Sequence, residues 1–206
     1  MSSERTASAE LAGSSLARRL RDLLGTIPAE PPLAADLPEL RDRARVEAAV
    51  LIAITDRVDP GVILTVRRDD LRTHAGQIAF PGGRVDAGEG AVDAALREAW
   101  EELALDPTAA EVVDTLDPYR TVTGYVVTPV VAVVPPDLPL VPHDREVADW
   151  FEAPLVHLLD PANHVQQSAL FEGRERHYYE ILWNGRRIWG ATAAMLINLS
   201  RRLNRG

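Results

Sequence analysis

Glu98, Glu101 and Glu102 have the spacing of neighbours on one side of a helix. At about 100° per residue, the three carboxylates share an arc of roughly 100°. Carboxylates gathered this closely repel one another, and sheltering them is costly unless a positive group lies among them. Hard divalent cations such as Mg²⁺ or Mn²⁺ take oxygen ligands. The spacing therefore indicates either a metal-binding helix face or an ordinary solvated one.

The residues around this helix favour the metal site. Gly82 and Gly83 allow the backbone to approach a ligand closely, and Glu89 adds a carboxylate before the helix. A helical projection places Arg97 beside Glu101, where its guanidinium can hold that carboxylate in position. Apolar residues form a separate stripe, so the carboxylates are expected at its edge, facing a cleft. This stripe comprises Val92, Ala95, Leu96, Ala99 and Leu103.

Taken together, these positions resemble the Nudix box, over residues 83–105. The matching glycine and charged positions are Gly83, Glu89, Arg97, Glu98, Glu101 and Glu102. The one departure is Ala104, which replaces a glycine where helices commonly end in a left-handed conformation. The resemblance implies a bound Mg²⁺ or Mn²⁺. Its implied ligands are Glu98, Glu101 and Glu102, supported by Glu89 and the carbonyl of Gly83.

The segment before the box is similar to the signature of coenzyme A diphosphatases. The matching residues are Leu64, Thr65, Arg67, Leu71, Arg72, His74, Gly76, Gln77 and 80–83. Arg68 departs from this signature, because that position usually holds a small residue. The similarity implies hydrolysis of the diphosphate bond of coenzyme A or an acyl-CoA to 3′,5′-ADP and (acyl-)4′-phosphopantetheine. The implied substrate-binding residues are Arg67, Arg72, His74, Gln77, Gly82 and Gly83.

Such a substrate carries a 3′-phosphate beside its diphosphate and needs positive charge. Arg67 and Arg72 can make bidentate phosphate contacts, and Arg68 can add to them. The alternative is that one of the three arginines only pairs with the neighbouring aspartates, Asp69 or Asp70.

In Nudix enzymes a loop beyond the box often brings in a further glutamate. Glu146 is the candidate here, and an ordinary surface charge is the alternative. The expected catalytic base is a glutamate, Glu98 or Glu146, because a metal and neighbouring carboxylates can shift its pKa. His74 is expected to be structural or to contact substrate. Two other functions remain open: a Nudix diphosphatase for another nucleoside diphosphate derivative (an NDP-sugar, a dinucleoside polyphosphate or an NTP), and a module that binds such a ligand without turnover.

Composition excludes several other classes. Lys and Arg number 22 against 31 Asp and Glu, a net charge of −9, which argues against non-specific nucleic-acid binding. There is no cysteine, so disulfides and thiolate metal sites are excluded. Neither a signal peptide nor an apolar run of roughly 20 residues is present. A cytoplasmic protein without membrane association is the expectation.

Hydrophobic patterning predicts a disordered tail over residues 1–14 and a single domain over 15–206. A helix is expected from Leu16, packed on its own domain or forming a homodimer contact. Strands are expected at 48–55, 62–66, 78–80, 112–115, 121–128, 129–134, 178–183 and 187–189, with a final helix over 191–203. Residues 166–176 read as polar and irregular. The aromatics Tyr178, Tyr179, Trp183 and Trp189 are expected in the core, or else as an adenine-stacking platform.

The mixture of strands and helices is typical of an α/β or α+β domain. The resemblance makes this more specific, because it implies the Nudix α/β/α sandwich, a mixed β-sheet between helices.

Overall fold

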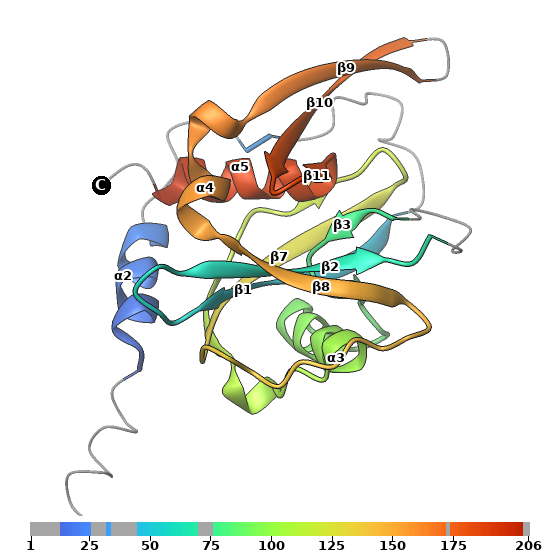
Figure 1. Cartoon of the computed structure of the whole chain (residues 1–206). Helices are drawn as coiled ribbons and strands as arrows, with labels where there is room; N and C mark the ends of the chain where they lie inside the picture. The colour runs from blue at the N-terminus through green and yellow to red at the C-terminus, as the bar shows by residue number, and fades with distance from the viewer. Residues whose placement is uncertain (1–12, 26–31, 34–44, 70–75, 172–173, 204–206) are drawn as a thin grey trace, which may run out of the picture.

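A large mixed sheet lies between helices in the computed structural model, which describes residues 13–25, 32–33, 45–69, 76–171 and 174–203 (Figure 1). Helix α3 (Ala91–Leu103) covers one face, and α5 (Ala191–Leu203) covers the other. Helix α2 (Ser15–Leu24) lies beside the C-terminal end of α5. The predicted sandwich of a mixed sheet between helices is confirmed.

Strand β1 (Val46–Thr55) lies at the centre of the large sheet. It pairs in parallel with β7 (Tyr125–Val134) and antiparallel with β2 (Gly61–Arg67) and β4 (Gly82–Arg84). The remaining strands of this sheet are β3 (Ile78–Ala79), β5 (Glu111–Thr115), β6 (Tyr119–Arg120) and β8 (Val147–Pro154).

The continuous apolar sequence of β1 follows from burial of both of its faces. Successive side chains of a strand point to opposite faces, and here they enter two separate cores. Ala48, Ile52 and Ile54 join the core that also contains the leucines of α2 and α5. Ala49, Leu51 and Ala53 join the core formed with the alanines of α3.

Helix α2 packs on its own chain, as the first of the two interpretations predicted. The Ser14 side chain accepts hydrogen bonds from the N–H groups of Leu16 and Ala17 and caps the helix. Leu16, Leu20 and Leu24 are buried in the same core as α5. Met195 and Ile197 of α5 are buried as expected.

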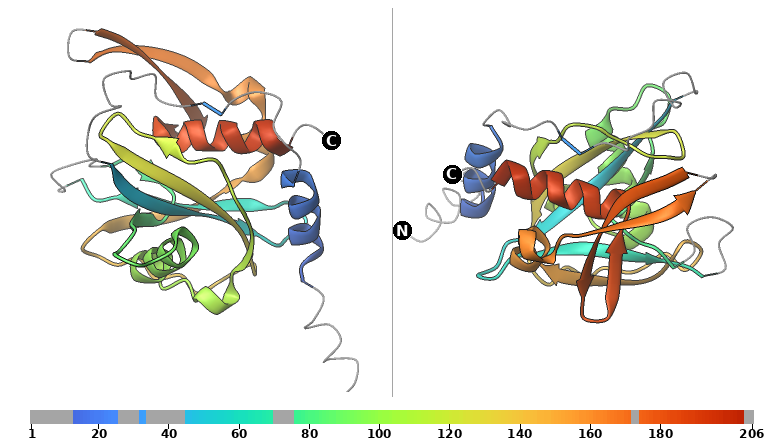
Figure 2. Two further views of the ribbon diagram at one scale, coloured as in Figure 1. Left: turned by 180° about the vertical axis from the view of Figure 1, so that it is seen from behind. Right: turned by 90° about the horizontal axis from the view of Figure 1, so that it is seen from above.

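The prediction that 166–176 is irregular was wrong. Strands β9 (Val165–Phe171) and β10 (Arg174–Trp183) form a ribbon, and β11 (Arg186–Trp189) completes a three-stranded sheet on the α5 side (Figure 2). The sequence hides these strands because much of the ribbon faces solvent: Leu170 is 78% exposed. Asn184 and Gly185, which have positive φ, form the turn between β10 and β11.

The prediction of separate strands at 121–128 and 129–134 was also wrong. A single strand, β7, runs through Pro129. Proline has no N–H to donate to a sheet. Strand β7 tolerates Pro129 because this residue lies between the segment that pairs with β5 and the segment that pairs with β6. Strand β5 pairs with β7 up to Val130, whereas β6 begins at the pair Tyr119–Val127. Among the further elements that were not expected from the sequence are β8 and the short helix α4 (Leu155–Leu159).

Within the part of the chain that the structure describes, no helix combines the length and apolar character needed to cross a bilayer.

Candidate active site

Two glycines bring β4 against both β1 and the acidic helix. Gly82 has φ +156°, and a Cβ there would lie 2.4 Å from the carbonyl oxygen of Ala49 in β1. A Cβ on Gly83 would lie 2.4 Å from Cδ of Glu98. The two glycines therefore let the backbone pass close to β1 and to Glu98, and the predicted approach to a ligand stays a prediction. Any side chain at position 83 would displace the Glu98 carboxylate.

Helix α3 packs closely on the sheet because its inner face is built of small residues. Ala94, Ala95 and Ala99 are fully buried, together with Leu103. The helix begins after Gly90, without a side-chain cap. Ala95, Ala99 and Leu103 of the predicted stripe are buried as expected. Val92 and Leu96 are only partly buried, and Glu102, expected at the edge of the stripe, is buried as well.

The helix ends in the left-handed conformation that glycine usually supplies, although the residue is alanine. Ala104 has φ 54° and ψ 29°. Its N–H donates to Trp100 O at 2.8 Å, and the N–H of Leu105 donates to Ala99 O at 3.3 Å. The departure from the Nudix box therefore preserves the shape of the cap, at a cost in backbone energy.

We expect Ala104→Gly to raise the free energy of unfolding by about 1 kcal/mol, because glycine adopts this conformation without a Cβ clash. Urea denaturation of both proteins measures the difference. The control is Ala162→Gly, at an exposed position that lies outside the set with positive φ; there glycine should destabilise the fold. A lower denaturation midpoint for Ala104→Gly would contradict the expectation.

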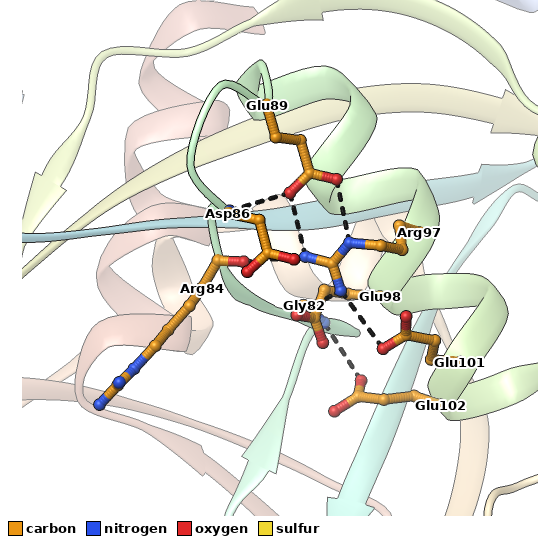
Figure 3. Close-up of polar contacts among 8 residues, drawn as sticks. All are labelled: Gly82, Arg84, Asp86, Glu89, Arg97, Glu98, Glu101 and Glu102. Carbon is orange, nitrogen blue, oxygen red and sulfur yellow. Dashed lines mark hydrogen bonds and ion pairs between the residues drawn. The ribbon is translucent and has the colours of Figure 1, made fainter.

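Arg97 is the centre of a network of ion pairs (Figure 3). Its Nε and Nη2 donate to the two carboxylate oxygens of Glu89 at 2.9 and 3.1 Å. Its Nη1 donates to Glu98 Oε1 at 3.0 Å and to Glu101 Oε2 at 3.3 Å. The predicted contact with Glu101 is confirmed, and the same guanidinium also donates to the carbonyl of Arg84 at 2.9 Å. The helix carboxylates and the turn before the helix are therefore held by one residue.

Glu89 faces Arg97 and forms a bidentate ion pair with it, which lowers the pKa of the Glu89 carboxyl. Its second contact is with the N–H of Asp86, at 3.0 Å. The sequence did not indicate that the 84–86 turn holds Glu89 and Arg97. Both contacts use backbone atoms of the turn, the N–H of Asp86 and the carbonyl of Arg84. The sequence signal for this turn is that Arg84 and Asp86 closely follow the two glycines.

Glu102 is the most sheltered of the three glutamates, at 5% exposure. Its Oε2 accepts a hydrogen bond from the N–H of Gly82 at 3.1 Å. Burial raises its pKa to about 8, even though that hydrogen bond and the charge of Arg67 act in the opposite direction. Glu98 and Glu146 add like-charge repulsion.

Glu98 and Glu101 differ in their surroundings. Burial raises the pKa of the Glu98 carboxyl, and the contact with Arg97 only partly offsets this. The charges of Glu101 and Glu146 raise it further. The side chain of Glu101 is 56% exposed, against 17% for Glu98. Two of the three carboxylates, those of Glu98 and Glu102, are therefore sheltered from solvent, and nearby positive charge does not fully offset the effect of burial on their pKa.

The connection that carries Glu146 is tied to the end of α3. The N–H of His143 donates to Glu102 O at 2.8 Å, and the N–H of Val141 donates to Leu103 O at 2.8 Å. Glu146 is exposed, but its charge raises the pKa of both Glu98 and Glu102. The structure therefore brings this predicted residue close to the acidic helix.

The predicted substrate-binding residues are only partly covered by the described residues. Arg72 and His74 lie outside them. The N–H of Arg67 donates to Gln77 O at 2.9 Å. The Nε of Arg67 is buried and has no hydrogen-bond partner among the described residues, although buried donors are normally satisfied. This unpaired donor, beside a glutamate whose pKa it lowers, fits a residue that binds an anion.

Two of the four aromatics lie against the core, as expected, and the other two contact each other and an arginine of the same sheet. Tyr179 and Trp183 pack against the core. Tyr178 and Trp189 meet edge to face with ring centroids 5.8 Å apart, and the guanidinium of Arg187 lies over both rings. Because Arg187 also pairs with Glu180 at 2.6 Å, this second group is satisfied within its own sheet.

The acidic cluster fits a hard cation by its chemistry. Among the described residues, no three acidic or histidine side chains already stand in a metal-holding arrangement; Glu98 and Glu101 turn toward Arg97, and Glu102 toward Gly82. The donors are nevertheless carboxylate oxygens, which such ions prefer. Burial raises the pKa of both Glu98 and Glu102, and a bound cation would favour the charged form of these carboxylates.

A model of the NUDIX domain matches residues 45–172, more than half of the chain. The chain belongs to the Nudix family. Nudix hydrolases cleave phosphoric anhydride bonds and generally need a divalent metal ion such as Mg²⁺ or Mn²⁺. The matched region includes the glycine turn, α3 and the connection that carries Glu146.

Relatives of this Nudix chain include NudL of Escherichia coli K12, described as an uncharacterized Nudix hydrolase. It is 44% identical over 155 residues, which cover 75% of this chain and 81% of the relative. NudL of Shigella boydii serotype 18 has the same identity and coverage.

Solved structures with a similar arrangement include the Nudix hydrolase RenU of M. smegmatis, with TM-score 0.48 and 23% identity over 62% of this chain and 81% of that one. A MutT/nudix family protein of Enterococcus faecalis has TM-score 0.48 and 17% identity, over 97% of this chain and 73% of that one.

Proposed function

We propose that the protein hydrolyses the diphosphate bond of coenzyme A or an acyl-CoA in the presence of Mg²⁺ or Mn²⁺. The observation that carries the proposal is the pair of sheltered carboxylates of Glu98 and Glu102, which lie against Gly83 and Gly82 of the glycine turn. Support for this substrate comes from the similarity of residues 64–83 to the coenzyme A diphosphatase signature and from the unpaired donor of Arg67.

In this proposal Glu98, Glu101 and Glu102 hold the ion, with the carbonyl of Gly83 as a further donor. A divalent cation bound there would neutralise the diphosphate oxygens and lower the pKa of the attacking water. Arg97 keeps Glu98 and Glu101 oriented and leaves one oxygen of each carboxylate outside its two hydrogen bonds.

The remaining steps belong to residues beside the ion. Glu98 or Glu146 accepts the proton of the attacking water, because a metal ion and neighbouring carboxylates can shift the pKa of such a glutamate. Arg67 donates to the diphosphate through its guanidinium group. The products are 3′,5′-ADP and (acyl-)4′-phosphopantetheine.

The deciding experiment is incubation of the full-length protein with coenzyme A and Mg²⁺ or Mn²⁺, followed by chromatography with mass detection. Appearance of 3′,5′-ADP supports the proposal. Unchanged coenzyme A, together with turnover of an NDP-sugar, a dinucleoside polyphosphate or an NTP, would reassign the substrate. Tight binding of coenzyme A without any product in the presence of Mn²⁺ would indicate a binding module.

We expect Arg67→Met to lower kcat/KM for coenzyme A by about 10- to 100-fold, the usual value of a hydrogen bond to a charged group. Dephospho-coenzyme A, which lacks the 3′-phosphate, serves as the internal control. An equal loss with both substrates means that Arg67 binds the diphosphate. A loss confined to coenzyme A would assign it to the 3′-phosphate, and no loss with either would contradict its role in binding.

A further inference from the structure

The end of β2 meets the connection that carries Glu146. The pairing of β2 with β8 shifts between Val66 and Arg67, so that Arg67 lies opposite Val147 while Val66 lies opposite Asp149. Such bulges commonly redirect side chains beside active sites. One residue further on, the N–H of Arg68 donates to Glu146 O at 3.2 Å. The backbone at 146 is therefore held directly by β2.

The side chain of Arg68 makes a second contact with the same turn. Its guanidinium donates to the carbonyl oxygen of Asp144. The small residue usual at this position of the signature could make the backbone contact, but it could not reach Asp144. The arginine therefore adds a tie that the usual sequence lacks.

The turn that Arg68 contacts is also tied to α3. The N–H of His143 donates to Glu102 O at 2.8 Å, and the N–H of Glu146 donates to His143 O at 3.1 Å. Residues 144–146 are themselves exposed, so little burial fixes their position. The turn is instead held between two elements, with Arg68 on the β2 side and the end of α3 on the other, and the backbone of Glu146 belongs to it.

From these contacts we infer that Arg68 is a positioning residue, which fixes the turn of residues 143–146 so that Glu146 faces the carboxylates of α3. This inference rests on the proposed diphosphatase function for its kinetic consequence. It differs from the expectation that Arg68 binds substrate phosphate, because the guanidinium is directed to a backbone carbonyl of the chain. Substrate affinity should then depend little on Arg68, whereas turnover should depend on it through Glu146.

The direct test compares amide hydrogen exchange of the metal-free, full-length wild type with Arg68→Ser and Arg68→Lys. We expect faster exchange in peptides covering residues 141–147 of Arg68→Ser, and partial rescue by lysine, which can still donate to Asp144 O. The matched control is Arg57→Ala, which removes an ion pair to Asp137 at the other end of the same connection and one to Glu152 near the far end of β8. It should leave exchange at 141–147 unchanged. Wild-type exchange in Arg68→Ser would overturn the inference.

The kinetic test is a double-mutant cycle with Glu146→Gln, measured on whichever diphosphate substrate the wild type turns over. We expect Arg68→Ser to lower kcat about tenfold with KM within about twofold of the wild type, since small displacements of a catalytic group are costly. In the Glu146→Gln background its effect should fall below about twofold.

Three kinetic results would overturn the inference: equal losses in both backgrounds, unchanged kcat in either single variant, or a rise in KM alone, which would assign Arg68 to substrate binding. If the wild type turns over no diphosphate, the proposed function fails, and the exchange experiment still decides whether Arg68 holds the turn.

Discussion

Glu102→Gln is expected to lower kcat for diphosphate hydrolysis by about a thousandfold or more, the several kcal/mol lost with an ion ligand. The amide keeps the shape of the side chain and can still accept the hydrogen bond from Gly82. Glu102 is the most buried of the three carboxylates, so water cannot easily replace it as a ligand. Glu98→Gln should have a similar effect, and Glu101→Gln a smaller one, because Glu101 is more than half exposed.

Steady-state kinetics with Mg²⁺ and separately with Mn²⁺ measure these losses. The control is Glu175→Gln, which removes an exposed carboxylate from β10, outside the acidic cluster; it should retain wild-type kcat and KM. Near-normal turnover by correctly folded Glu102→Gln would remove the basis of the metal-dependent mechanism.

The same substitution is expected to stabilise the metal-free protein at alkaline pH. The folded-state pKa of Glu102 is about 8, against 4.5 for the exposed group. Between these two pH values the unfolded chain has released this proton while the folded protein retains it, so the free energy of unfolding falls as pH rises. The fall levels off above pH 8. Glu102 alone should contribute about 3 to 5 kcal/mol to it, and Glu102→Gln should abolish that contribution.

Urea denaturation at pH 5 and pH 8.5 in the presence of a chelator measures this difference. Addition of Mn²⁺ at pH 8.5 should restore stability to the wild type, because an ion that binds only the folded state stabilises it, and should do so much less for Glu102→Gln. Equal pH dependence in the two metal-free proteins would show that Glu102 titrates normally.

Much of the acidic helix could be predicted because its information is local. Periods of 3.6 residues place Glu98, Glu101 and Glu102 on one edge and the alanines on the other, and the glycines before the helix announce a close approach. Ala104 illustrates the limit of such reasoning. A left-handed cap favours glycine by only about 1 kcal/mol, so tertiary contacts can impose the same conformation on alanine.

The features that could not be predicted depend on distant segments or on backbone atoms. The multiple partners of Arg97 include the carbonyl of Arg84, which no side-chain pattern reveals. The side chain of Glu102 meets the N–H of Gly82, a residue of β4, which pairs with the distant strand β1. The β9–β10 ribbon lacks apolar alternation because it is largely exposed, and Pro129 suggested a strand boundary that the gap between β5 and β6 makes unnecessary.

Helix α5 is synthesised last and contacts the strand that leads into the glycine turn, which affects when this site can be completed during synthesis. The Oγ1 of Thr192 donates to the carbonyl of Ile78, 3.1 Å away, in the short strand just before the glycine turn. Asn198 exchanges hydrogen bonds with the backbone of Leu33 at the other end of the chain. Chains emerge from the ribosome amino terminus first. Strand β3, which leads into the glycine turn, therefore lacks its hydrogen bond with α5 until residue 192 has been synthesised. A nascent chain can thus contain every glutamate of the box before this contact beside the site has formed.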